Sequence, residues 1–143
     1  MLSEKVREYI RHPSDIPIFV ATEKANNQMN LALNNISTGG LAFDTPTFLE
    51  EGSVVNIKIN SVKPSFRVKG IVAWCEPKEA HFEVGVEFIG HKDAYRVRMV
   101  EQVCHIEHYK KAVKANEGRN ISGEAAACEW IEKYASTFPN PKP

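Results

Sequence analysis

Cysteine is scarce in this sequence, and the spacing of its cysteines excludes the usual metal or disulfide frameworks. The chain of 143 residues has 3 cysteines, Cys75, Cys104 and Cys128, which lie far apart and form no C-x-x-C pair. An odd number of widely spaced cysteines argues against a zinc site or a disulfide-stapled domain. We therefore expect reduced, buried thiols in a cytoplasmic protein, with no metal and no cofactor.

Long apolar runs and an excess of charge of one sign are also missing. No run approaches the roughly 18 apolar residues of a membrane span. The opening residues 1–5 lack the apolar core of a signal peptide, so we expect no export. Lysine and arginine number 18, aspartate and glutamate 18, and the formal net charge is +0. This balance argues against binding a nucleic acid polymer by general electrostatics, although a small phosphate ligand needs only a local basic cluster.

The sequence contains no arrangement of residues typical of a catalytic or metal centre. No Ser/His/Asp or Cys/His combination has supporting context, and Glu50–Glu51 fall in a turn-like segment. Two histidines and two glutamates lie close together in the expected helix, and His105 shares a face with Glu101 at i, i+4, but no third ligand of defined geometry accompanies that pair. We interpret them as a solvated helix face: Glu101, His105, Glu107 and His108. No catalytic residue is assigned, and we do not expect an enzyme.

Strand-like alternation is present over residues 16–88. Apolar and polar residues alternate with a period of two, which places one face in a core and the other in water. Several short strands at this spacing are typical of a sandwich or a barrel, and a closed barrel leaves no exposed edges. Gly70 and Gly85 interrupt two of the runs and predict a bulge, a bend or a close approach. The runs are 16–21, 29–34, 55–60, 66–74 and 82–88, with a further apolar run at 41–43.

From about residue 92 the period becomes helical. Apolar residues recur at 99, 103, 106 and 113, and Gly118 is a helix-stop residue. Ser122 is a good N-cap for a second helix that ends before Pro139. Its expected apolar face consists of Ala127, Trp130, Ile131 and Tyr134. The chain is long enough for one domain.

The segment Asn35-Ile36-Ser37-Thr38-Gly39-Gly40 is open to three interpretations. It fits a tight turn between strands, because asparagine and serine can bond neighbouring backbone and glycine accepts positive φ. Asn35-Ile36-Ser37 also fits a glycosylation sequon, which we reject because no secretory signal precedes it. The third interpretation is a ligand-binding edge, where an amide and a hydroxyl lie beside exposed backbone. The upstream arginines favour this third interpretation.

Arg7 and Arg11 place two guanidinium groups four residues apart. Taken alone, they fit a solvated charged arm. Guanidinium also offers a planar fork of donors that matches phosphate oxygens and the O6/N7 edge of guanine. The residues 12–15, His-Pro-Ser-Asp, force an extended path after the pair, because the residue before a proline avoids the helical region.

These motifs together resemble the PilZ domain family, bacterial receptors for cyclic di-GMP. The family pattern is R-x3-R, then D/N-x-S-x-x-G, then a G-x-V-x-W strand and a VGV-F strand. Here the four parts stand at 7–11, 35–40, 70–74 and 84–88, in that order. The resemblance covers about residues 5–110.

The resemblance implies a mainly β fold, a six-stranded antiparallel β-barrel with C-terminal helices. We expect an arm at 1–15, a barrel plus helix at 16–118, and a helical extension and tail at 119–143. The arm and the 35–40 loop would clasp cyclic di-GMP against the outer surface of the barrel. Arg7 and Arg11 would bind guanine and phosphate, Asn35 and Ser37 the guanine edge, and Gly40 would shape the turn.

Three further residues are candidate ligand contacts: Val6, Gly39 and Trp74. An apolar residue just before the first arginine, as at Val6, implies a single ligand molecule per site. Trp74 is either a stacking platform or a tryptophan partly in the core.

The function implied by the resemblance is a non-enzymatic second-messenger receptor that changes conformation on binding and signals to an unidentified protein partner. Family outputs include swimming, surface attachment in biofilms and pilus control. The alternative is a PilZ-fold interaction module that docks protein without nucleotide, and the presence of both arginines favours the receptor. The helix from about 122 lies beyond the family pattern, and we expect it to pack on the domain or to dock a partner.

Overall fold

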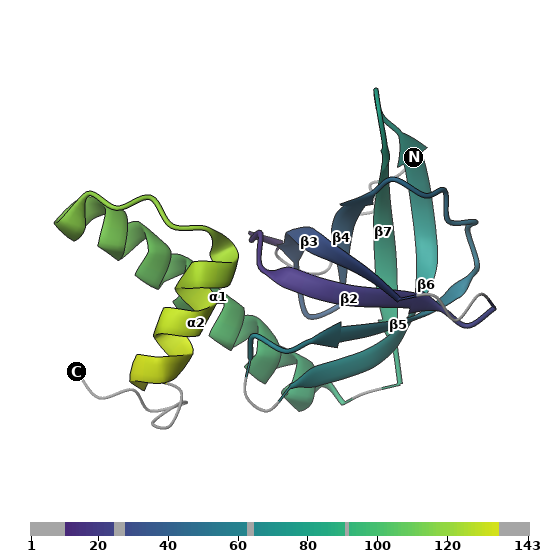
Figure 1. The fold of residues 1–143 in the computed structure, drawn as a ribbon. Helices are drawn as coiled ribbons and strands as arrows, with labels where there is room; N and C mark the ends of the chain where they lie inside the picture. Colours follow the sequence, from purple (N-terminus) through teal and green to yellow (C-terminus); the bar gives the residue numbers. More distant parts are fainter. Residues whose placement is uncertain (1–10, 25–27, 63–64, 91, 135–143) are drawn as a thin grey trace.

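The computed structural model describes residues 11–24, 28–62, 65–90 and 92–134. Within these ranges a group of strands is followed by two helices (Figure 1). The elements are β1 (His12–Pro13), β2 (Pro17–Thr22), β3 (Gln28–Ile36), β4 (Gly40–Thr45), β5 (Val54–Ile59), β6 (Phe66–Pro77), β7 (Phe82–Ile89), α1 (Asp93–Glu117) and α2 (Gly123–Tyr134).

Six of the strands form a closed antiparallel barrel. The hydrogen-bonded order is β1-β3-β2-β5-β6-β7-β4, and an additional pairing of β3 with β4 closes the ring. Closure removes the open edges that a flat sheet of this size would expose. The six-stranded barrel expected from the sequence is therefore confirmed, with the two-residue β1 as an extra strand beside β3.

The barrel interior follows the alternation of the sequence. In β2 and the residue before it, Ile16, Ile18 and Val20 are all 0% exposed, whereas Pro17 and Phe19 on the opposite face are half-buried. Fully burying one such apolar side chain contributes about 1.5–3 kcal/mol. The same rule fills the barrel from every strand, so the core forms one continuous cluster.

Two β-bulges change which side chains face outward. The β3–β4 register shifts between Leu33 and Asn35, and the β6–β7 register shifts between Val72 and Trp74. A bulge inserts one extra residue and re-aims the side chains that follow it. Strict alternation from Val72 would place Trp74 on the inward face, but the extra residue at Ala73 reverses the alternation. Trp74 lies opposite Gly85, on the outer face.

Helix α1 is fastened to the barrel at its start. The ring of Tyr95 stacks on Phe66, with 5.1 Å between centroids, and its hydroxyl donates to the Ser65 carbonyl and accepts from the Arg67 amide. The predicted stripe at 99, 103, 106 and 113 is buried, as expected. Gly118 ends the helix in the left-handed region, with φ 70°, which confirms its role as the stop residue.

Helix α2 packs against α1, and Figure 1 shows both helices gathered on one side of the barrel. Ser122 is its N-cap, because its Oγ accepts from the Ala125 amide at 3.0 Å. Ala126, Ala127 and Trp130 are buried in the common core. The Trp130 ring stacks on His105 of α1 at 5.9 Å. These contacts show that α2 packs on the domain, which is one of the two roles expected for it.

A polar cluster, the α1–α2 clip, joins the outer sides of the two helices. It consists of Tyr109 on α1, Arg119 in the connection and Glu129 on α2. The Tyr109 hydroxyl donates to Glu129 Oε1 at 2.6 Å, and Arg119 donates to both carboxylate oxygens at 3.1 and 3.2 Å. These bonds from Arg119 and Tyr109 lower the pKa of Glu129 to about 2.

The three cysteines are free thiols, as expected, but they are not buried. Cys75 and Cys104 are half-buried, and Cys128 is exposed on α2. The expectation of buried thiols is therefore wrong, because cysteine's preference for interiors gives way to the face on which each position falls. Burial, followed by the charges of Glu101 and Glu107, raises the pKa of Cys104.

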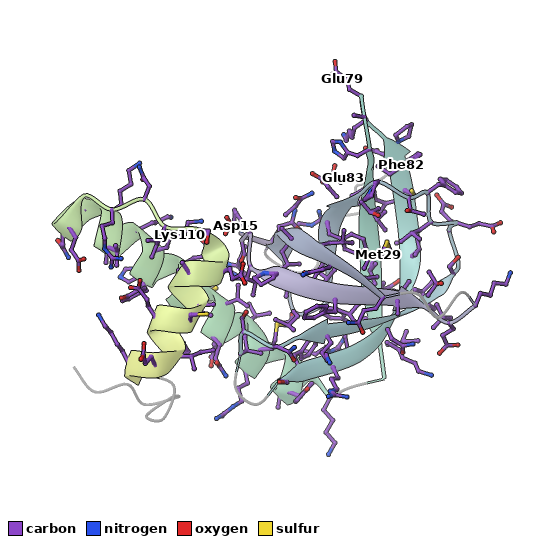
Figure 2. The ribbon with its side chains drawn as sticks, in the orientation of Figure 1. Asp15, Met29, Glu79, Phe82, Glu83 and Lys110 are labelled. Carbon is purple, nitrogen blue, oxygen red and sulfur yellow. The ribbon has the colours of Figure 1, made fainter. Side chains whose placement is uncertain are left out.

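Asp15 joins the barrel entrance to both helices. Its carboxylate accepts from Lys110 Nζ of α1 at 3.0 Å, and Figure 2 shows these two side chains facing one another. A Cβ placed on Gly123, the first residue of α2, would lie 2.0 Å from the same carboxylate.

No helix among the residues that the structure describes is long and apolar enough to cross a bilayer.

Candidate functional site

A pocket of about 200 Å³ lies on the outer surface of the barrel where β3, β4, β6 and β7 run side by side. The pocket brings together residues that lie far apart in the sequence, from residue 11 to residue 87. Its lining consists of Arg11, Asn35, Ser37, Gly39, Gly40, Leu41, Ala73, Trp74, Gly85, Val86 and Glu87. Every described residue that the sequence nominated as a ligand contact therefore lines one pocket.

Beneath the pocket lies a row of residues paired across four strands, which we call the floor row. Asn35 of β3 lies opposite Ala42 of β4, which lies opposite Gly85 of β7, which lies opposite Trp74 of β6. The two middle positions carry almost no side chain. A Cβ on Gly85 would lie 2.2 Å from Trp74 Cε2, so the indole rests directly on the Gly85 backbone. The two bulges create this row, because they bring Asn35 and Trp74 to the outer face.

The bulge in β3 is held by side chains. Asn34, the residue between Leu33 and Asn35, donates from Nδ2 to Asp44 Oδ1 at 2.9 Å and to Glu83 Oε2 at 3.2 Å. Its neighbour Asn35 makes no side-chain hydrogen bond to another described residue and stands half-buried at the pocket. The Asn35 amide is therefore available to a ligand.

The Ser37 hydroxyl organises the 37–40 turn. Its Oγ accepts from the amides of Gly39 and Gly40 at 3.1 and 3.2 Å, and Ser37 donates its own amide to the Gly40 carbonyl at 2.8 Å. The side chain is 7% exposed. Direct contact of Ser37 with a ligand stays a prediction; the bonds observed shape the loop.

Gly40 is required for close approach and not for positive φ. A Cβ at this position would lie 2.1 Å from the Val86 carbonyl oxygen. The described glycines with φ in the left-handed region are Gly52, Gly90 and Gly118, so the positive φ considered for the 39–40 pair does not occur. The other close approaches expected, at Gly70 and Gly85, are confirmed.

Arg11 reaches the pocket because β1 pairs with the end of β3. His12 lies opposite Ile36 and Pro13 opposite Asn35, and the Ser14 amide donates to the Asn34 carbonyl at 3.2 Å. Arg11 is exposed and makes no ion pair with a described residue. Val6 and Arg7, the other arm candidates, lie outside the described residues.

A second groove lies on the other side of β1, against α1. It has a volume of about 780 Å³ and is lined by His12, Thr38, Val97, Val100, Glu101, Cys104, His105 and His108. In the described part of the chain, no group of three or more His, Cys, Asp or Glu side chains could hold a metal ion. His105 instead stacks on Trp130.

Sequence reasoning missed β1 and several pocket residues. Two residues are too short a run to show any period, so the extended path expected at 12–15 did not identify β1 as a strand. Leu41, Ala73, Val86 and Glu87 enter through strand register, which a single sequence does not reveal. For Glu87 one signal existed: it follows Gly85 by two residues and so shares its face.

The comparisons with known proteins point to one family. The family model for the PilZ domain matches residues 5–104. A search of curated proteins gave no match.

Solved structures of low sequence identity share the fold. The PilZ domain of YcgR from Escherichia coli with c-di-GMP aligns with a TM-score of 0.62 and 17% identity, over 79% of this chain and 98% of that one. The Bacillus subtilis inhibitor of motility MotI/DgrA gives 0.58 and 15%, over 74% of this chain and 53% of that one. The K. pneumonia MrkH–c-di-GMP complex gives 0.57 and 16%, over 75% and 56%. The chain thus spans about half the length of MotI and MrkH.

Proposed function

Because the chain belongs to the PilZ domain family, we propose that it is a receptor for cyclic di-GMP, without catalytic activity, that signals to a protein partner. The observation that carries the proposal is the convergence of Arg11 with Asn35 and Trp74 in one pocket. These residues are 24 and more positions apart in the sequence, and β1 and the two bulges bring them together.

The chemistry of the pocket fits a guanine nucleotide. Arg11 offers a planar donor fork that matches phosphate oxygens or the O6/N7 edge of guanine. Trp74 presents a flat ring on which a base can stack, and stacking on an aromatic side chain contributes roughly 1–3 kcal/mol per base. Asn35 adds an amide donor and acceptor at the opposite end of the floor row.

The size of the pocket limits what it holds. Its volume of about 200 Å³ is below the roughly 300–1,000 Å³ of pockets that enclose a drug-sized ligand. The pocket would therefore take one base of the ligand, and the arm residues 1–11 would cover the remainder. Contacts between the ligand and the arm would then provide the change that a protein partner reads, since a ligand shifts a conformational equilibrium only through contacts that differ between the two states.

Replacing Arg11 by alanine tests the proposal. Loss of a charge-assisted hydrogen bond costs roughly 1.5–3 kcal/mol, so the dissociation constant for cyclic di-GMP should rise about 10- to 150-fold. Titration calorimetry on the full chain measures this, and Arg7→Ala should behave alike. Arg67→Ala is the matched control, because Arg67 is an exposed arginine of β6 that lies outside the pocket.

Equal affinities of the wild type and Arg11→Ala would contradict the assignment of the arginine. A wild type that does not bind cyclic di-GMP would defeat the receptor itself and leave the PilZ-fold module that docks protein without nucleotide. Cyclic di-AMP and GTP serve as specificity controls in the same titration.

A further inference from the structure

We propose that Glu87 selects guanine in this pocket, by accepting hydrogen bonds from the N1–H and N2–H₂ groups of the base. The inference rests on the proposed receptor function and adds an acidic residue to the site. Glu87 is the acidic residue in the lining of a pocket that we propose binds an anionic ligand.

The backbone of Glu87 is fixed on both sides. In β7, Glu87 lies opposite Gly40 of β4 and opposite Ile71 of β6. The next amide, that of Phe88, donates to the Gly39 carbonyl at 2.9 Å, which ties β7 to the motif loop. A Cβ on Gly40 would lie only 3.3 Å from Glu87 Cα. The residue therefore stands directly beside the 35–40 loop.

The Glu87 side chain shares the outer face with the pocket floor. Val86 and Phe88, its two neighbours, are 4% and 5% exposed and point into the core. Successive side chains of a strand point to opposite faces, so Glu87 points outward together with Gly85. Two residues of strand span about 7 Å. A base stacked on the Trp74 ring over Gly85 therefore has Glu87 at its rim.

The contrast with Glu83 shows that Glu87 has no structural task among the described residues. Glu83 lies on the same strand and face, and it accepts from Asn34 and pairs with Lys78 at 3.5 Å. Glu87 is exposed and makes no ion pair or side-chain hydrogen bond with another residue that the structure describes. With respect to the described part of the chain, its carboxylate oxygens are open to a ligand's donors.

Guanine has two edges of opposite character, and the pocket has a partner for each. Its O6 and N7 are acceptors, which suit the Arg11 fork. Its N1–H and N2–H₂ are donors, which suit a carboxylate, because an ionised carboxylate only accepts. Adenine carries an acceptor at N1 and no amino group at C2, so the same carboxylate would face a lone pair.

The sign of the effect of neutralising Glu87 separates this role from a passive one. A carboxylate that only lies near the ligand repels its phosphates, so removing the charge would tighten binding. A carboxylate that accepts from the base contributes charge-assisted hydrogen bonds, so removing its charge would weaken binding of the ligand.

The experiment compares the wild type with Glu87→Gln, using cyclic di-GMP, cyclic di-IMP and cyclic di-AMP as the titrants. Cyclic di-IMP lacks the N2 amino group and is otherwise the same ligand. We expect the wild type to prefer cyclic di-GMP over cyclic di-IMP, and Glu87→Gln to reduce that preference by about tenfold or more while weakening cyclic di-GMP binding. Glu51→Gln, an exposed carboxylate of another pocket, is the matched control and should match the wild type.

Wild-type binding with a preference that Glu87→Gln leaves unchanged would overturn this inference alone. Tighter binding of all three ligands by Glu87→Gln would overturn it too, and would assign the carboxylate a repulsive role. A wild type that binds none of them would remove the receptor function and the inference together.

Discussion

At the scale of single residues, the pocket depends on side chains that are absent. Ala42 and Gly85 carry almost no side chain where β4 and β7 pair, which gives Trp74 a surface to rest on. The motifs of the sequence include Gly40 and Trp74, but they do not show which neighbouring atoms require these residues. Trp74 could not be oriented from the sequence, because a bulge at Ala73 reverses the alternation on which the orientation depends.

Replacing Gly85 by alanine tests this contact. The added Cβ would lie 2.2 Å from Trp74 Cε2, so the indole must move. We expect the free energy of unfolding to fall by about 1–3 kcal/mol, the usual cost of overpacking. Denaturant unfolding, followed by far-UV circular dichroism, measures it. In a Trp74→Leu background the same substitution should cost clearly less, and an equal cost in both backgrounds would place the strain elsewhere.

At the scale of elements, the sequence reveals where a helix begins or ends better than it reveals which elements contact one another. The C-terminal end of α1 and the start of α2 were predictable, because Gly118 and Ser122 act on the backbone within one turn. The clip between the helices was not, because Tyr109, Arg119 and Glu129 meet only after α2 has folded back on α1. The bulges fall in the same class, since they depend on the partner strand.

The α1–α2 clip predicts a dependence on acid. Its hydrogen bonds lower the folded-state pKa of Glu129 from 4.5 to about 2. A lowered pKa stabilises the fold above the unfolded value, and that stabilisation is lost as pH falls toward the folded value. The melting temperature of the wild type should exceed that of Glu129→Gln at pH 6, and the gap should close between about pH 4.5 and 2.

Glu132→Gln is the control for the acid prediction. Glu132 is an exposed carboxylate of the same helix that makes no ion pair with a described residue. A gap that closes equally in this variant would show that helix charge in general, and not the clip, is responsible. Differential scanning fluorimetry across the pH range provides all three curves.

At the scale of the whole molecule, the barrel was predictable and the pocket only in part. Period-two alternation from 16 to 88 indicated which residues fill the interior, and the core bears this out. The pocket depends on β1 beside β3 and on the register of four strands, which one sequence does not contain. The motifs predicted several residues that line the pocket, but they did not predict that these residues lie in one row across four strands.

Ligand binding should raise the stability of the whole domain. At 100 times its dissociation constant, a ligand that binds only the folded state adds about 2.7 kcal/mol. For a chain of 143 residues this is a rise in melting temperature of several degrees. A thermal melt with and without cyclic di-GMP measures it, with Arg11→Ala at the same concentration as the reference. An unshifted melt would favour protein docking without nucleotide.

The two-residue strand β1 has a consequence for how substitutions near it are interpreted. Arg11 borders the small pocket on the barrel wall, and His12 borders the large groove along α1. Consecutive Cα atoms are 3.8 Å apart, so the two cavities meet at neighbouring positions of one short strand. The barrel wall and the helical flank therefore have a common boundary in β1, and a substitution at residue 11 or 12 should be checked for its effect on both cavities.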